Sequence, residues 1–178
     1  ISMPTSVTSI GTNVFQSCSD LSTVTLSTTL TSIPDFAFAL CPKITSISIH
    51  EQITSIGKQA FDSTGLTSIN IPQKTTFIGL YAFRLCTSLK SITVASGNTV
   101  YTIDNGALIE NKNTLVLYPT MNTERKEYTI PSTVTTIKGY AFNGNTHLDY
   151  IKFHDNIQTI EEYAFKGMIG LKTLTLPN

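Results

Sequence analysis

Apolar residues recur along the chain in a repeat of 22 or 23 residues, marked by a phenylalanine that follows a small or β-branched residue. An aliphatic residue lies five positions before each of these phenylalanines, and in most copies another lies three positions earlier. The marking residues are Phe15, Phe38, Phe61, Phe83, Phe142 and Phe165. Periodicity of this length is typical of repeat architectures, in which each period is one supersecondary unit.

An apolar triplet spaced L-x-x-I-x-I follows each phenylalanine. The triplets are Leu21/Val24/Leu26, Ile44/Ile47/Ile49, Leu66/Ile69/Ile71, Leu89/Ile92/Val94, Leu148/Ile151/Phe153 and Leu171/Leu174/Leu176. Their last two positions are two residues apart, which is the period of a strand with one buried face. Each unit therefore predicts a strand, a polar turn, a short aliphatic segment and a single helical turn around the Ala-Phe pair.

One such unit cannot fold alone, because it buries too few apolar side chains to offset the entropy lost on ordering its backbone. Stacked units share a core and pair their strands in parallel. We therefore predict an α/β solenoid with a parallel β-sheet of short strands on one face and single helical turns on the other. Residues 1–178 are expected to form one solenoid. Because both ends of the sequence fall at the end of a strand, this solenoid is expected to be a segment of a longer array.

The repeat is irregular at about 95–131. Ala107-Leu108 is preceded by aliphatic residues at the usual offsets and is predicted to be a weaker copy of the Ala-Phe pair. The run 115–119 predicts an additional strand, and Asp104-Asn105-Gly106 is typical of a turn. Residues 121–126 carry charge without an apolar pattern. They form either a solvated loop or a protruding recognition loop.

Composition and charge exclude several classes of partner. The 178 residues include 29 Thr and 17 Ser, with 12 basic and 12 acidic side chains and a formal net charge of +0. This balance argues against binding to nucleic acid, which needs a basic surface. No apolar run approaches the length of about 20 residues that crosses a bilayer, so we expect no membrane insertion of this segment.

Cysteines and histidines are few and follow the repeat. Cys18, Cys41 and Cys86 each lie three residues after the repeat phenylalanine, without the clustered spacing of a metal or redox site. We expect buried free thiols, with a Cys18–Cys41 bridge between neighbouring units as the alternative. His50 and His154 occupy equivalent positions in distant units, so they cannot share a metal, and with His147 they are expected to be surface residues.

No pattern of catalytic residues stands out. The acids Asp149, Asp155, Glu161 and Glu162 are expected to face solvent, and stacked units enclose no pocket for glycosidase chemistry. The nucleophile, phosphate-binding and dinucleotide motifs are absent from the sequence. We therefore predict no catalytic residues, no metal, no cofactor and no enzymatic activity.

The outward side of the predicted strands is the candidate partner-binding face. Strand alternation places on it Thr23, Thr25, Ser46, Ser48, Ser68, Asn70, Ser91, Thr93, Tyr150, Lys152 and Thr173, with His154 just beyond. Small polar columns are also what an exposed pleated surface favours without any ligand. An aromatic side chain with a polar tip is a common interface anchor, so Tyr150, Lys152 and His154 form the preferred part of this face.

The repeat resembles the BspA-like leucine-rich repeats, whose consensus approximates L-x-x-I-x-I-P-x-x-V-T-S-I-G-x-x-A-F-x-x-C. The matching residues are 7–18, 53–61 and 130–142, and the likeness extends over essentially the whole chain, including a longer variant unit at 106–119. The resemblance implies a horseshoe-like solenoid with a parallel sheet. It also implies a surface protein of host-associated bacteria or parasitic protists that adheres to host cells or matrix proteins.

Three functions remain as hypotheses. The first is a non-enzymatic extracellular binding module that contacts a host surface or matrix protein through the strand face. The second is a structural spacer that projects another domain and binds nothing itself. A third, an ice- or crystal-binding surface of threonine ladders, is disfavoured because the Ser and Thr columns are chemically uneven.

Overall fold

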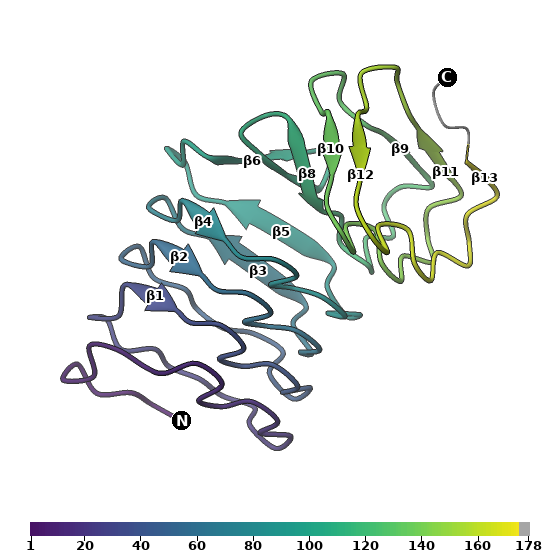
Figure 1. The fold of residues 1–178 in the computed structure, drawn as a ribbon. Coiled ribbons are helices and arrows are strands. Elements are labelled where there is room, and N and C mark those ends of the chain that lie inside the picture. The colour runs from purple at the N-terminus through teal and green to yellow at the C-terminus, as the bar shows by residue number, and fades with distance from the viewer. Residues whose placement is uncertain (175–178) are drawn as a thin grey trace.

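The chain winds from one end of an elongated molecule to the other as a stack of similar coils, which we call rungs (Figure 1). The structure is a computed structural model and describes residues 1–174, so the predicted triplet position Leu176 lies outside the described residues. Thirteen short strands and no helix occur within residues 1–174. The repeat solenoid with parallel strands is thus confirmed, whereas its α/β class is not, because the helical part is absent from the described chain.

Four of the six L-x-x-I-x-I triplets contain parallel strands along one side, namely β3 (Ser68–Ile71), β5 (Ser91–Val94), β11 (Tyr150–Lys152) and β13 (Thr173–Leu174). β9 (Glu127–Thr129), in the irregular region, extends this set by pairing with β11. The triplets at 21–26 and 44–49 contain no strand, and only Thr25 forms an isolated bridge, to Ser2. β3 pairs with β5, and β11 pairs with β9 and β13. In β3 the side chains alternate between exposed and buried, as the two-residue period predicts.

The short aliphatic segments form a second set of parallel strands, which the sequence pattern did not predict as strands. They are β1 (Ser32–Ile33), β2 (Ser55–Ile56), β4 (Phe77–Ile78), β10 (Thr136–Ile137) and β12 (Thr159–Ile160). Ile33, Ile56 and Ile78 lie in register on neighbouring rungs. In four of the six rungs, the aliphatic residue five positions before the phenylalanine is therefore a buried strand residue, namely Ile33, Ile56, Ile78 and Ile137. At the two ends the pattern weakens, because Ile10 lies in no strand and Ile160 is exposed.

The predicted helical turn around each Ala-Phe pair is wrong, because these segments are runs of tight turns. The residues two positions before and two positions after the phenylalanine have positive φ, as Phe36 (56°) and Leu40 (59°) do beside Phe38. A helix needs negative φ at every residue. Because residues with negative and positive φ alternate in these turns, the N–H groups of every second residue point to the same side. Those of Phe36, Phe38 and Leu40 donate to carbonyls of Lys58, Ala60 and Asp62 on the next rung.

The irregular region is an antiparallel meander of three strands. These are β6 (Tyr101–Asp104), β7 (Ala107–Glu110) and β8 (Thr114–Leu117). The additional strand predicted at 115–119 is confirmed, because β8 pairs in parallel with β10. The assignment of Ala107-Leu108 as a copy of the Ala-Phe turn is wrong, since both residues lie in β7.

Tyr118 occupies the repeat phenylalanine position in this region. Its ring stacks on Phe142 with centroids 5.5 Å apart, and its N–H donates to the carbonyl oxygen of Ala141. Leu115 pairs with Ile137 in register. Tyr118 lies three positions after Leu115, whereas Phe142 lies five positions after Ile137. The turn of this rung is therefore two residues shorter than that of its neighbours.

The repeat rings form two columns rather than one continuous row. Phe15, Phe38, Phe61 and Phe83 stack in the first, and Tyr118, Phe142 and Phe165 stack in the second. Within residues 1–174, no aromatic contact joins Phe83 to Tyr118. The buried apolar residues likewise divide into two clusters, on either side of the meander.

Candidate functional site

The early part of the predicted face is a set of exposed, short polar side chains, as expected. Thr23, Thr25, Ser46, Ser48, Ser68, Asn70, Ser91 and Thr93 are all exposed. Ser68 lies opposite Ser91 and Asn70 opposite Thr93, whose hydroxyl donates to the Asn70 amide oxygen at 2.9 Å. These columns carry no charge and no aromatic anchor.

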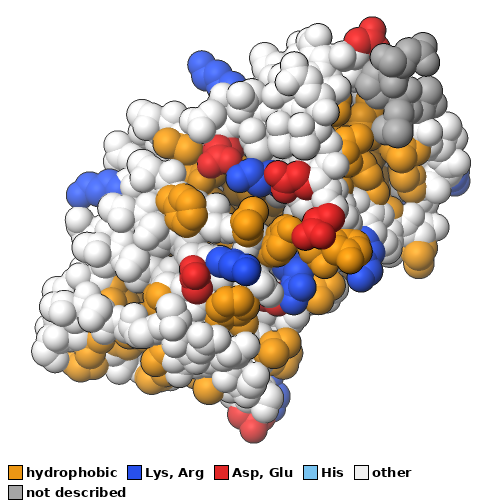
Figure 2. Space-filling view, in the orientation of Figure 1, with side chains coloured by type: hydrophobic (Ala, Val, Ile, Leu, Met, Phe, Trp, Pro, Cys, Tyr) orange, Lys and Arg blue, Asp and Glu red, His pale blue; other side chains and the backbone are white. Residues whose placement is uncertain are grey.

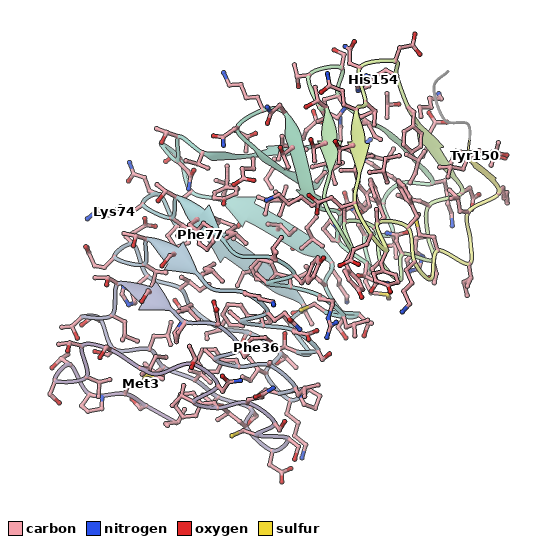
Figure 3. The ribbon with its side chains drawn as sticks, in the orientation of Figure 1. Met3, Phe36, Lys74, Phe77, Tyr150 and His154 are labelled. Atoms are coloured by element: carbon pink, nitrogen blue, oxygen red, sulfur yellow. The ribbon has the colours of Figure 1, made fainter. Side chains whose placement is uncertain are left out.

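The later part of the face is chemically richer. Tyr150 is 43% exposed and lies between Glu127 and Thr173 across β9, β11 and β13. The Lys152 ammonium lies 2.5 Å from a Glu127 carboxylate oxygen. The Lys172 ammonium lies 2.9 Å from the Asp149 carboxylate and 6.0 Å from the centroid of the Tyr150 ring. Hydrogen bonding to Lys172 lowers the pKa of Asp149. Figure 3 shows Tyr150 at one edge of the molecule.

His154 lies beyond this patch, and all three histidines, His50, His147 and His154, are half-buried rather than fully exposed. The Nδ1 of His154 accepts the N–H of Asn156. Its Nε2–H donates to the carbonyl oxygen of Pro131 on the preceding rung at 2.8 Å. His50 makes the same two kinds of bond, one with the carbonyl oxygen of Ser27 on the preceding rung and one with the N–H of Gln52. Both imidazoles therefore join neighbouring rungs, and neither ring nitrogen of His154 is available to a partner.

The three cysteines are free thiols, with Cys41 and Cys86 buried and Cys18 half-buried. The Cys41 and Cys86 thiols donate to main-chain carbonyls of the preceding rung, Phe15 at 3.0 Å and Phe61 at 3.1 Å. Burial raises the pKa of Cys86 to about 11. These protonated thiols are rung-to-rung donors, and the alternative Cys18–Cys41 bridge is absent.

A cleft that the sequence did not reveal opens where the two ring columns are interrupted. Its lining combines aliphatic side chains with Tyr81, Arg84, Lys138, Tyr140 and Glu161. Its cavity volume is about 30 Å³, and the cleft is open to solvent. Figure 2 shows hydrophobic side chains and both signs of charge gathered across the middle of the face drawn.

Ion pairs hold the cationic side chains of the cleft. Arg84 donates two hydrogen bonds to the Asp62 carboxylate, which is buried, and its guanidinium lies 5.5 Å from the centroid of the Tyr140 ring. Lys138 lies 3.0 Å from Glu110. The opposite charges therefore fix the positions of both cations.

Hydrogen bonds across the cleft join residues far apart in the sequence. The Tyr81 hydroxyl donates to Glu162 at 2.5 Å, and this bond raises the pKa of Tyr81 to about 12. Glu161 accepts the N–H of Gly139 at 2.9 Å. The Tyr81 and Tyr140 rings meet edge to face, with centroids 5.0 Å apart. The sequence signal for this site was the irregular spacing between Phe83 and Phe142.

The charged segment 121–126 is attached to the rungs at its start. Met121 donates its N–H to the carbonyl oxygen of Leu89 at 2.7 Å, and Asn122 is buried. Residues 123–127 are exposed. The loop is therefore partly anchored and partly solvated, and its role in recognition stays a hypothesis.

Within residues 1–174, no helix is long and apolar enough to cross a membrane. Across the same residues, no three His, Cys, Asp or Glu side chains are grouped so that they could hold a metal ion.

Known structures share the fold over most of the chain. The pneumococcal vaccine antigen PcpA matches all of it with a TM-score of 0.89 and 24% identity, over 50% of the antigen chain. A leucine-rich repeat protein from Eubacterium ventriosum matches 86% of the chain with a TM-score of 0.75 and 31% identity, over 47% of its own chain. A leucine rich cell surface protein from Faecalibacterium prausnitzii matches 93% with a TM-score of 0.79 and 29% identity, over 50% of its own chain.

The chain thus spans about half the length of these three proteins. A comparison with the sequences of curated proteins found no match. The model of the BspA type leucine rich repeat region matches residues 1–115 and 119–178 in six copies. Together with the stacked rungs, this match shows that the chain belongs to the BspA-type leucine-rich repeat family.

Proposed function

We propose that the chain is a non-enzymatic, adhesion-type module of a cell-surface or secreted protein, and that it binds a protein ligand such as a host-surface or matrix protein. Membership of the BspA-type family supports this proposal, as does the similarity to a protein described as a leucine rich cell surface protein. The ligand contacts the outer side of β9, β11 and β13, and the short polar columns of β3 and β5 extend the same face.

We choose this surface because the Tyr150 side chain is exposed while the charged side chains beside it are held in ion pairs. A tyrosine ring gives a large contact area at low entropic cost, and its hydroxyl still bonds to a partner. Glu127 and Asp149 hold Lys152 and Lys172 beside the ring. A ligand would therefore meet an aromatic centre with a charged rim that is already oriented.

Binding to immobilised matrix proteins tests the proposal. The wild-type chain and the double variant Tyr150→Ala/Lys152→Ala are passed over fibronectin, laminin and collagen surfaces. Loss of a central aromatic anchor is expected to weaken saturable binding at least about tenfold. The double variant Thr31→Ala/Ser32→Ala changes exposed polar side chains at β1, outside the proposed face, and serves as the control, with affinity within about twofold of the wild type.

Two outcomes contradict the proposal. Equal loss in both double variants would show that Tyr150 is not the centre of the contact. Failure of every form to bind any of the surfaces saturably would favour the alternative function, a structural spacer that projects another domain.

A further inference from the structure

Three backbone N–H groups at the edge of the cleft lack a protein acceptor. In the rung of Phe38, three alternate N–H groups donate to the next rung, as described above. The corresponding groups are those of Tyr81, Phe83 and Leu85, and none of them donates to a backbone or side-chain acceptor in residues 1–174. The same alternation of backbone hand is present here, since Tyr81 and Leu85 have φ of 59° and 55°. By the register of the other rungs, these three N–H groups face the side on which the next rung would lie. Tyr81 and Phe83 line the cleft, and Leu85 directly follows its lining residue Arg84.

The shortened turn before Tyr118 explains why these donors are free. Repeat register would place the carbonyl groups of Leu115, Leu117 and Pro119 near them, but Leu117 lies in β8 and pairs with Leu108 of β7. The Leu115 carbonyl instead accepts the N–H of Lys138 at 2.9 Å, and the Pro119 carbonyl accepts the Asn145 side-chain amide at 3.0 Å. With two residues missing from the turn, no other carbonyl of that rung replaces them. One wall of the cleft is therefore a row of hydrogen-bond donors.

The opposite wall carries acceptors. Glu161 and Glu162 each use one carboxylate oxygen in the bonds to Gly139 and Tyr81, and among residues 1–174 neither has a cation within 4.0 Å. The cations in the lining are already neutralised by Asp62 and Glu110. The negative charges of Glu161 and Glu162 therefore repel a free anion. A simple cation has no lone pair to offer, so the N–H donors would stay without an acceptor.

We propose that the cleft binds a neutral saccharide, which goes beyond the proposed protein-binding function. A hydroxyl group donates one hydrogen bond and accepts two, and it rotates to suit its neighbours. Sugar hydroxyls can thus accept from the N–H row and donate to Glu161 and Glu162. The Tyr140 ring and the aliphatic lining offer apolar surface to the C–H face of the sugar. A peptide fits less well, because its own fixed N–H groups would face a wall of donors.

Titration of the isotope-labelled chain with methyl glycosides tests the inference. The probes are the methyl glycosides of glucose, galactose, mannose and N-acetylglucosamine, followed by amide chemical shifts. At least one glycoside is expected to shift the amide signals of Tyr81, Phe83, Leu85 and Gly139 saturably, with a dissociation constant on the order of 1 mM. Saturation-transfer signals from the C–H face of the bound sugar provide a second readout on the unaltered protein.

A matched pair of variants locates the site. Tyr140→Ala removes a ring that lines the cleft and is expected to weaken glycoside binding about tenfold or more. Phe36→Ala removes the ring at the same repeat position, with the same positive φ, in a rung whose N–H groups are all bonded, and is expected to leave binding unchanged. Melting temperatures show whether each variant is folded.

Three results would overturn the inference. The first is that no glycoside gives saturable shifts up to about 100 mM. The second is that Phe36→Ala and Tyr140→Ala lose binding equally. The third is that the neutral peptide acetyl-Gly-Ser-Gly-amide shifts the same amides more strongly than the glycosides do. If Tyr140→Ala does not fold, the wild-type titration still decides. None of these results depends on whether matrix proteins bind at Tyr150.

Discussion

Tyr118 packs on Phe142 with ring centroids 5.5 Å apart and ring planes 21° from parallel, in the position that phenylalanine holds in the other rungs. The ring is fully buried, yet its hydroxyl has no hydrogen-bond partner among residues 1–174. Burial raises the pKa of this phenol. A tyrosine at this position therefore supplies the stacking surface of a repeat phenylalanine and also carries an uncompensated polar atom.

The first prediction concerns this hydroxyl. Tyr118→Phe is expected to leave the free energy of unfolding unchanged or to raise it by up to about 1 kcal/mol, because an unpaired buried polar atom is removed. Tyr118→Ala is expected to lower it by about 3–5 kcal/mol, because the ring leaves a cavity. Urea unfolding followed by circular dichroism measures both. A clear loss in Tyr118→Phe would show that the hydroxyl has a partner.

The second prediction concerns the close approach of neighbouring rungs. A Cβ atom at Gly57 would lie 2.5 Å from the backbone nitrogen of Asp35, whereas one at Gly11, the same repeat position, would have nothing within 4 Å. Gly57→Ala is expected to destabilise the chain by about 2 kcal/mol or more, because backbone must shift. Gly11→Ala is expected to be neutral or stabilising by about 0.5 kcal/mol. Equal thermal unfolding of the two variants would contradict the rung spacing.

The third prediction concerns alkaline stability. Burial raises the pKa of Cys86 from 9.0 to about 11, so the thiol ionises earlier in the unfolded chain than in the folded one. Its contribution is fully present below pH 9 and is lost as the pH rises toward 11, by an amount on the order of 2 kcal/mol. Melting temperatures at a series of pH values across this range measure the loss.

Cys86→Thr is the control for this effect. Thr64 occupies the same repeat position, and its hydroxyl donates to the carbonyl oxygen of Phe61, so a threonine keeps a donor but does not titrate. The variant is expected to lose less stability between pH 9 and 11 than the wild type. Parallel pH profiles of the two proteins would show that Cys86 is not buried as described.

Much of the fold could be predicted from the sequence, because buried strand positions leave a two-residue alternation. Ile69 and Ile71 face the core, and Ser68 and Asn70 face solvent, as that alternation predicts. The turn around Phe38 could not be predicted in the same way. Two adjacent apolar residues fit a helical turn and an alternating-hand turn equally well, and positive φ at a bulky residue such as Phe36 leaves no mark in composition.

The two candidate sites also differ in how far the sequence predicts them. Strand alternation predicts that Tyr150 and Lys152 are exposed, but it does not predict that the column of stacked rings is interrupted. Tyr118 was missed because the offset of five residues that identifies every other ring shrinks to three there. The unbonded N–H groups beside the cleft belong to the backbone and leave no mark in the residue pattern, so only the irregular spacing between Phe83 and Phe142 indicates the place.

The central claim is that stacked rungs are joined by a ladder of N–H bonds through the ring residues and that this ladder is interrupted once. The N–H groups of Phe38, Phe61 and Phe142 each donate to the next rung at 2.8 or 2.9 Å, whereas that of Phe83 does not. Residue-resolved amide hydrogen exchange measures this most directly. We predict strong protection of Phe38, Phe61 and Phe142 and exchange at least about a hundredfold faster at Phe83. Equal protection at Phe83 and Phe61, or fast exchange at all four, would contradict the account.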